Sequence, residues 1–193
     1  MLDIPQAARY LAPLVSDRPQ CSVYIATSVD GYIARPDGGL DWLARVEVQG
    51  EDYGYAAFFA GVDALVIGRN TYDTVLGFGQ WPYMGKRCVV LTHRPADPRD
   101  GVEFFAGEPG SLLERLALEG IRHVYVDGGA VIRQCLAAGL VDELTLSMIP
   151  IVLGAGIRLF TGGEPELGLR LVGCRSWPTG LVQLRYCAPN RGR

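Results

Sequence analysis

One short segment constrains the fold of this chain more than any other. It is Ala64-Leu65-Val66-Ile67, which is followed by Gly68 and Arg69-Asn70-Thr71. Apolar residues without polar alternation predict a strand that is buried on both faces, as in the centre of a parallel sheet. The glycine breaks this run, and we predict a helix over 71–76. Such a junction presents free backbone N–H groups and the positive end of a helix dipole to an anion, although it equally fits an ordinary connection with a surface arginine.

Two later segments repeat this feature. A strand predicted over 122–126 leads through Asp127-Gly128-Gly129-Ala130 into a helix predicted over 131–138. A strand predicted over 86–92 runs into Thr92-His93-Arg94, which supplies hydroxyl, imidazole and guanidinium groups. Ligands of open α/β sheets bind at the carboxyl ends of the strands. The three junctions together therefore predict a nucleotide-binding cradle, which none of them predicts alone.

The remaining segments predict the fold class. Further strands are expected over 21–29, 32–34, 102–105 and 141–149, and further helices over 51–60 and 112–118, the second begun by the capping box Ser111 to Glu114. The segments 168–175 and 180–187 predict an antiparallel hairpin. This order predicts an α/β fold with a mixed, mainly parallel sheet, helices on both faces and a C-terminal antiparallel hairpin. We expect an N-terminal amphipathic arm over 1–19 and a single domain over 20–193.

Composition excludes several classes of function. The chain has 193 residues, of which 49% are hydrophobic, and a formal net charge of −3. No electrostatic footprint for nucleic acid is visible, and no apolar run approaches the length of a membrane span. Five scattered cysteines without a Cys-x-x-Cys pair predict reduced, buried thiols in a cytoplasmic protein. With only two histidines, we also expect no metal site.

The standard nucleotide-binding motifs are missing from the sequence. Gly154-Ala155-Gly156 continues to Leu159 where a Rossmann fingerprint requires glycine, and Gly77-Phe78-Gly79 continues to Pro82. Neither a P-loop nor a Gly-x-Ser-x-Gly nucleophile elbow occurs. The expected cradle therefore binds an anion without a standard glycine set.

The segments themselves resemble a known superfamily. Residues 66–72, 89–95 and 126–132 resemble the three cofactor-binding segments of the dihydrofolate reductase superfamily, and residues 26–34 resemble its opening segment. One branch is more similar still, on the evidence of Asp30-Gly31-Tyr32-Ile33-Ala34, Asp41-Trp42, Val141-Asp142-Glu143-Leu144 and Pro150-Ile151-Val152-Leu153-Gly154. That branch is the reductase domain of bacterial riboflavin biosynthesis and its stand-alone relatives. The resemblance covers roughly residues 21–187.

The resemblance implies an NADPH-dependent reductase that transfers a hydride to a C=N or C=O carbon of a small heterocycle, a ribosylaminopyrimidine or a pterin. It also implies a set of cofactor-binding residues: Gly68, Arg69, Asn70 and Thr71 on the pyrophosphate and adenosine side; Leu91, Thr92, His93 and Arg94 near the adenosine 2′-phosphate; Asp127, Gly128, Gly129, Ala130, Val131 and Ile132 at the second helix start; and Ala26 and Ile33 beside the nicotinamide. The residues themselves favour NADPH over NADH, because no acidic side chain stands ready to bind a free ribose 2′-hydroxyl.

The catalytic assignments are Asp52 and Ser147. An ungapped count back from Gly68 places Asp52 at the position of the superfamily's catalytic carboxylate. Buried beside a ligand, Asp52 would have a raised pKa and could protonate or orient the substrate. It equally fits a solvated acid in the first turn of a helix. Ser147, on the strand predicted over 141–149, could assist by hydrogen bonding.

Two departures from the superfamily keep the substrate open. Lys86 stands where an arginine would clamp the glutamate of folate, and a point charge does not replace a bidentate fork. The zinc motif of the deaminase that is usually fused to the riboflavin enzyme does not occur in this sequence. We expect a homodimer that forms through a sheet edge or the N-terminal arm. The alternatives are a dihydrofolate or pterin reductase and a non-catalytic NADPH-binding protein of the same fold.

Overall fold

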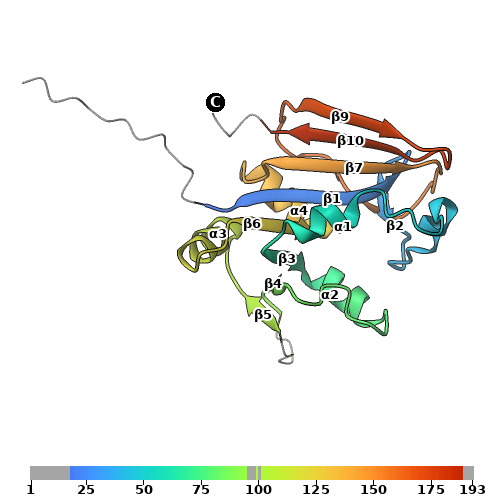
Figure 1. Cartoon of the computed structure of the whole chain (residues 1–193). Helices are drawn as coiled ribbons and strands as arrows, with labels where there is room; N and C mark the ends of the chain where they lie inside the picture. Colours follow the sequence, from blue (N-terminus) through green and yellow to red (C-terminus); the bar gives the residue numbers. More distant parts are fainter. Residues whose placement is uncertain (1–17, 95–98, 100, 189–193) are drawn as a thin grey trace, which may run out of the picture.

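An eight-stranded sheet forms the centre of the computed structural model, which describes residues 18–94, 99 and 101–188. The arm predicted over 1–19 lies outside these residues except for its last two. The strands are ordered β5-β4-β3-β6-β1-β7-β10-β9, and a small second sheet pairs β2 with β8 (Figure 1). Their bounds are β1 Gln20–Ser28, β2 Tyr32–Ala34, β3 Ala64–Gly68, β4 Arg87–Leu91, β5 Val102–Phe105, β6 His123–Asp127, β7 Glu143–Ile149, β8 Ile157–Arg158, β9 Arg170–Ser176 and β10 Val182–Cys187.

The sheet is mainly parallel, which confirms the predicted fold class. Strand β1 lies in the middle and pairs in parallel with both β6 and β7. Strand β3 pairs in parallel with β4 and β6, and β5 continues the parallel part beyond β4. Only β10 and β9 run antiparallel to their neighbours, and they form the predicted hairpin at one edge of the sheet (Figure 1).

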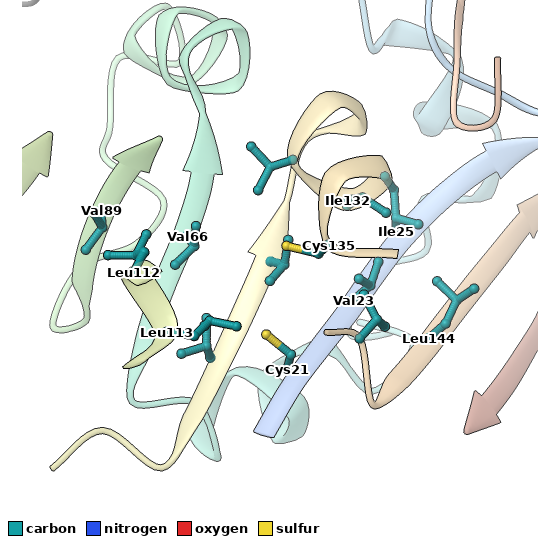
Figure 2. Close-up of a cluster of buried hydrophobic side chains, with 14 of the residues drawn as sticks. Cys21, Val23, Ile25, Val66, Val89, Leu112, Leu113, Ile132, Cys135 and Leu144 are labelled. Atoms are coloured by element: carbon teal, nitrogen blue, oxygen red, sulfur yellow. The ribbon is translucent and has the colours of Figure 1, made fainter. Parts of the chain in front are cut away.

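Helices cover both faces of the sheet, as predicted. On one face, α3 (Pro109–Leu118) and α4 (Gly129–Ala137) pack against apolar side chains of the central strands. Figure 2 shows Leu112 and Ile132 of these helices together with Val23 of β1 and Val66 of β3. On the other face, α1 (Tyr55–Ala60) and α2 (Arg69–Leu76) pack against β3 and β4. The 3₁₀ helix η1 (Asp41–Val46) belongs to a third, smaller cluster around the buried Trp42.

All four predicted helix starts differ from the structure. Helices α2 and α4 begin at Arg69 and Gly129, each two residues before the predicted start, and the starts of α3 and α1 differ by more. Helix α3 begins at Pro109, so Ser111 lies inside the helix and makes no cap. A proline in the first turn has no N–H to leave unpaired, so it sets the start two residues before the predicted cap. Helix α1 begins at Tyr55 rather than at Glu51, because Gly54 at the N-cap has a left-handed φ of +90°. Tyr53 before it is also left-handed, at +58°.

The cysteines are free thiols, and they differ in how deeply they are buried. Cys21, Cys88 and Cys135 are buried, as predicted. Cys174 on β9 is exposed and Cys187 on β10 is half-buried, because the hairpin at the edge of the sheet has little covering its faces. In the part of the chain that the structure describes, no helix has the length and apolar character needed to cross a membrane.

Candidate cofactor and substrate site

A cavity of about 510 Å³ opens at the carboxyl ends of β1, β3, β4 and β6. It brings together the three junctions that the sequence singles out, although they are far apart along the chain. Most of the predicted cofactor-binding residues line it: Ala26, Ile33, Gly68, Arg69, Asn70, Thr71, Leu91, Thr92, His93, Asp127, Gly128, Gly129, Ala130 and Val131. The structure therefore places these residues around one space.

The two strand–helix junctions meet so closely that only glycine fits between them. Gly128 has a φ of +94°, and a Cβ atom there would lie 2.3 Å from the Thr71 Oγ1. A Cβ atom on Gly129 would lie 2.8 Å from the Ile33 Cδ1. Neither Gly68 nor Gly128, the N-cap residues of α2 and α4, provides a side-chain cap. The N-termini of both helices therefore face the cavity without a side-chain cap, which suits a bound anion.

Cationic side chains stand beside these helix starts. The Arg69 Nε donates to the Asp73 Oδ1 at 2.8 Å. The Arg94 Nη2 donates to the Asn70 Oδ1 at 2.9 Å, and the Arg94 backbone N–H donates to the Thr92 Oγ1 at 3.0 Å. The loop after β4 thus docks on the first turn of α2. Arg94 itself does not line the cavity, but its guanidinium group is held at the rim by Asn70, which does.

Asp127 places a carboxyl group inside the cavity. Its Oδ1 accepts a hydrogen bond from the Gly128 N–H at 2.7 Å, and its Oδ2 accepts one from the Tyr83 hydroxyl at 3.1 Å. Burial raises the pKa of Asp127 above its usual value, and the two hydrogen bonds oppose that rise without cancelling it. This side chain therefore keeps its proton to a higher pH than an exposed aspartic acid does.

Three tyrosines, Tyr24, Tyr83 and Tyr125, also line the cavity. The Tyr24 hydroxyl donates to the Tyr53 carbonyl oxygen at 2.8 Å, and the Tyr125 hydroxyl donates to the Tyr24 carbonyl oxygen at 2.9 Å. None of these three tyrosines was predicted from the sequence as a site residue. Alternation along β1 could have found Tyr24, because it shares a face with Ala26 two residues later. Tyr83 lies in a loop, where the sequence has no helical or strand periodicity that could indicate which way its side chain points.

The structure does not bring Asp52 to the cavity, and the expectation of a buried carboxyl with a raised pKa is wrong. The Asp52 side chain is exposed, and it accepts hydrogen bonds from the N–H groups of Gly54 at 2.8 Å and Ala56 at 2.9 Å. These backbone bonds lower the pKa of Asp52. The reason is the late start of α1, which leaves Asp52 before the helix, where it caps the first turn.

Three other residues also lie away from the cavity. Ser147 is buried and does not line the cavity, and its Oγ accepts a hydrogen bond from the Gln183 Nε2 at 3.0 Å. Both Gln183 and Ser147 interact with the hydroxyl of Tyr24, which does line the cavity. Ile132 is fully buried in the core between α4 and the sheet, contrary to its assignment as a cofactor contact. The Lys86 Nζ donates to the carbonyl oxygens of Ala60 and Val62.

The model of the RibD C-terminal domain family matches residues 19–183. The chain belongs to this family. The uncharacterized protein YwjB of Bacillus subtilis (strain 168) is 37% identical over 167 residues, which cover 85% of this chain and 95% of YwjB. The riboflavin biosynthesis protein RibD of Corynebacterium ammoniagenes is 31% identical over 157 residues, and the match spans 72% of this chain but only 45% of that longer protein.

Solved structures agree with this membership of the RibD C-terminal domain family. A putative riboflavin biosynthesis protein from Shewanella sp. PV-4 superposes with a TM-score of 0.83 at 36% identity, over 89% of this chain and 99% of that one. A diaminohydroxyphosphoribosylaminopyrimidine deaminase/5-amino-6-(5-phosphoribosylamino)uracil reductase from Thermotoga maritima has a TM-score of 0.68 at 16% identity, over 89% of this chain and 57% of that one. The second likeness is one of fold.

Proposed function

We propose that this RibD-like chain is an NADPH-dependent reductase of a small heterocyclic substrate. The observation that carries the proposal is that Asp127, a half-buried carboxyl group, faces the same cavity as the N-termini of α2 and α4, which have no side-chain cap. A cradle for anions and an acid in one cavity are the two parts that a reduction by hydride and proton requires. Family membership and the reductase named in the Thermotoga maritima structure support the same reaction class.

The residues present fit a nicotinamide dinucleotide. The glycines at 128 and 129 let the two helix starts pack closely against Thr71 and Ile33. Both helix starts therefore line one cavity, where their backbone N–H groups would bind a pyrophosphate. Thr92, His93 and Arg94 lie at the end of β4 beside Asn70, where they would hold a 2′-phosphate. Ala26 and Ile33 line the adjoining apolar part, where they would flank the nicotinamide ring. A reduced nicotinamide supplies a hydride when it is bound.

Asp127 would provide the proton. As the carbon of a C=N or C=O bond accepts the hydride, the nitrogen or oxygen of that bond takes the proton from the Asp127 carboxyl group. Asp127 is left as a carboxylate and regains a proton from solvent. Its raised pKa makes the protonated form available closer to neutral pH than for an ordinary aspartic acid. The aromatic lining from Tyr24, Tyr83 and Trp42 suits a flat heterocycle.

The test begins with binding and continues with turnover. NADPH and NADH are titrated separately against the protein, and Arg94→Ala is titrated alongside. We expect tighter binding of NADPH, and an affinity loss in Arg94→Ala of about tenfold for NADPH and little for NADH. NADPH oxidation is then followed with a dihydropterin, dihydrofolate and 5-amino-6-(5-phosphoribosylamino)uracil as acceptors.

Each result distinguishes the candidates. Oxidation with the ribosylaminopyrimidine places the chain in riboflavin biosynthesis, whereas oxidation with a pterin or folate selects the alternative reductase. Tight NADPH binding without oxidation by any acceptor favours the non-catalytic NADPH-binding protein. A flat NADPH titration contradicts the proposal as a whole. The free thiols of Cys21, Cys88 and Cys135 fit the reducing cytoplasm, where we propose that the protein acts.

A further inference from the structure

The loop over residues 77–86, between α2 and β4, brings an unassigned side chain into the cavity. Gly79 and Gly85 have φ values of +74° and +77°, which allow the chain to turn at both ends of the loop. Between these turns Tyr83 is 5% exposed, whereas Met84 next to it is 68% exposed. The loop therefore buries one tyrosine at the cavity wall.

Aromatic packing fixes the position of the Tyr83 ring. Trp81 meets Tyr83 edge-on, with 5.3 Å between the ring centroids and 89° between the ring planes. Tyr72 of α2 packs on Trp81 at 6.1 Å, so the contacts continue into the core. The Lys86 N–H also donates to the Tyr83 carbonyl oxygen at 3.2 Å, which closes a turn around the residue. The hydroxyl group is thus held on a rigid support.

That hydroxyl group meets the carboxyl group proposed above as the proton donor. Its hydrogen bond to the Asp127 Oδ2 is 3.1 Å long, and the Gly128 N–H binds the other oxygen at 2.7 Å. Two donors on the two oxygens define the plane of the carboxyl group, which otherwise turns about a soft terminal torsion. We infer that Tyr83 is a positioning residue that holds the Asp127 carboxyl group toward the bound acceptor. This inference rests on the proposed function.

The same contact has a consequence for titration. A hydroxyl that donates to a carboxylate favours the charged form, so Tyr83 lowers the pKa of Asp127 while burial raises it. Tyr55 of α1, Cys88 of β4 and Tyr125 of β6 also interact electrostatically with Asp127, which contributes to the raised pKa of each of them. All three are neutral at neutral pH. Tyr83→Phe therefore leaves burial unopposed by this bond and raises the pKa of Asp127.

Tyr83→Phe tests the inference because it removes only the hydroxyl group. Tyr72→Phe is the matched control, since Tyr72 is an equally buried tyrosine of the same aromatic cluster that does not line the cavity. The ¹³C shift of the Asp127 carboxyl carbon is titrated by NMR in the unsubstituted protein and both variants, with Asp127→Asn to assign the signal. We expect the pKa of Asp127 to rise by about one unit in Tyr83→Phe and to stay unchanged in Tyr72→Phe.

Turnover gives a second, independent readout. Activity should fall as pH rises through the pKa of Asp127, because the proton is needed, and Tyr83→Phe should move this limb to higher pH by the shift seen in NMR. We expect kcat at low pH to fall about tenfold with an unchanged KM for NADPH, since the acid is less well oriented. Adding Tyr83→Phe to Asp127→Asn should cause no further loss.

The two proposals can fail separately. An unchanged titration of Asp127 in Tyr83→Phe overturns the positioning role, even if the unsubstituted protein reduces an acceptor. An unsubstituted protein that oxidises no NADPH overturns the proposed function, while the NMR titration still reports whether Tyr83 acts on Asp127. Equal effects of Tyr83→Phe and Tyr72→Phe show a general packing effect and contradict the inference.

Discussion

Two aspartates illustrate how burial decides the chemistry of one residue type in this chain. Asp52 is exposed and bound by backbone N–H groups, so its pKa is lowered and it holds a charge. Asp127 lies at the cavity wall, where burial raises its pKa, so it keeps its proton to a higher pH than Asp52 does. The carboxyl group suited to acid catalysis is therefore the one at the end of β6, and not the one that precedes α1.

Substitution of these two residues makes the contrast measurable. Asp127→Asn keeps the size and hydrogen-bonding shape of the side chain but removes the transferable proton. We expect turnover to fall about 100-fold or more, with NADPH affinity within about twofold of the original value. Asp52→Asn should change neither quantity. Steady-state kinetics and a binding titration on each variant are the measurements, and equal losses in both variants would contradict the assignment.

Asp30 predicts a pH dependence of stability. Its carboxylate accepts bonds from the Ser28 hydroxyl and from the N–H groups of Leu153 and Gly154, which together lower its pKa from 3.8 to about 2. The folded state thus binds this proton less readily than the unfolded chain, so the stabilisation is complete above pH 3.8 and is lost as pH falls toward 2.

Asp30→Asn should therefore lower the free energy of unfolding at neutral pH, and its difference from the unsubstituted protein should shrink as the solution is acidified. Urea unfolding at a series of pH values measures this. Glu114→Gln, on the exposed side of α3, is the control and should follow the unsubstituted protein throughout. A difference that stays constant down to pH 2 would show that the carboxylate charge contributes nothing.

At the scale of elements, the close contact between the ends of β3 and β6 predicts that adding one methyl group there destabilises the fold. Gly128→Ala introduces a Cβ atom 2.3 Å from the Thr71 Oγ1 at a left-handed backbone position. Gly120→Ala is the control, because Gly120 has a similar φ of +86° and nothing within 4 Å of the added atom. We expect about 1 kcal/mol of destabilisation at Gly120 and about 2–3 kcal/mol at Gly128.

A second substitution separates crowding from backbone strain. Thr71→Ala removes the oxygen that lies nearest to the new Cβ atom, and the next Thr71 atom is 3.4 Å away. The double variant should therefore regain part of the stability that Gly128→Ala loses, as measured by chemical unfolding. Equal destabilisation by Gly120→Ala and Gly128→Ala would show that the two junctions can move apart without loss of stability, and would contradict the prediction.

Most elements of the fold were predictable because each has a local cause. The buried run of β3 has no polar residue, and Gly68 marks its end. Helix α4 begins at Gly129, the second of two glycines, and ends before Gly139. The start of α3 was not predictable from the capping box, because Pro109 competes for the same turn. The start of α1 depends on the left-handed Tyr53, whose conformation no residue pattern indicates.

The cradle was more predictable than the catalytic part of the site. Gly68 and Gly128 lie next to the helix starts in the sequence, so they indicate the two strand–helix junctions directly. The acid was harder to predict, because the pKa of Asp127 depends on burial and on a hydrogen bond from Tyr83, which is close to Asp127 only in space. Counting residues back to Asp52 assumed a helix start that the chain does not use.

At the scale of the whole molecule, one edge of the sheet has features that favour self-association. Strand β9 ends the sheet order, so one side of its backbone has no neighbouring strand in the described part of the chain. Leu169 and Leu171 are 38% and 51% exposed along this edge. Unpaired strand edges with apolar side chains favour pairing with a second chain. We therefore propose that the predicted homodimer forms here.

Leu171→Glu tests this proposal by placing a charge on the edge. We expect the unsubstituted protein to sediment as a dimer and Leu171→Glu as a monomer, in sedimentation equilibrium across a range of concentrations. Leu118→Glu is the control, because Leu118 is 90% exposed at the end of α3 and should not alter the mass. A monomeric unsubstituted protein contradicts the proposal outright.

The position of β1 in the middle of the sheet governs how the chain can fold during translation. Both neighbours of β1 are made much later, since Gln20 pairs with His123 and Ser22 with Glu143. Strand β1 therefore leaves the ribosome with both edges unsatisfied until β6 and β7 have been synthesised, and such long-range pairing is slow. Substitutions that delay β6 or β7 should therefore appear first as a need for chaperones and as insoluble protein, before any loss of activity per folded molecule.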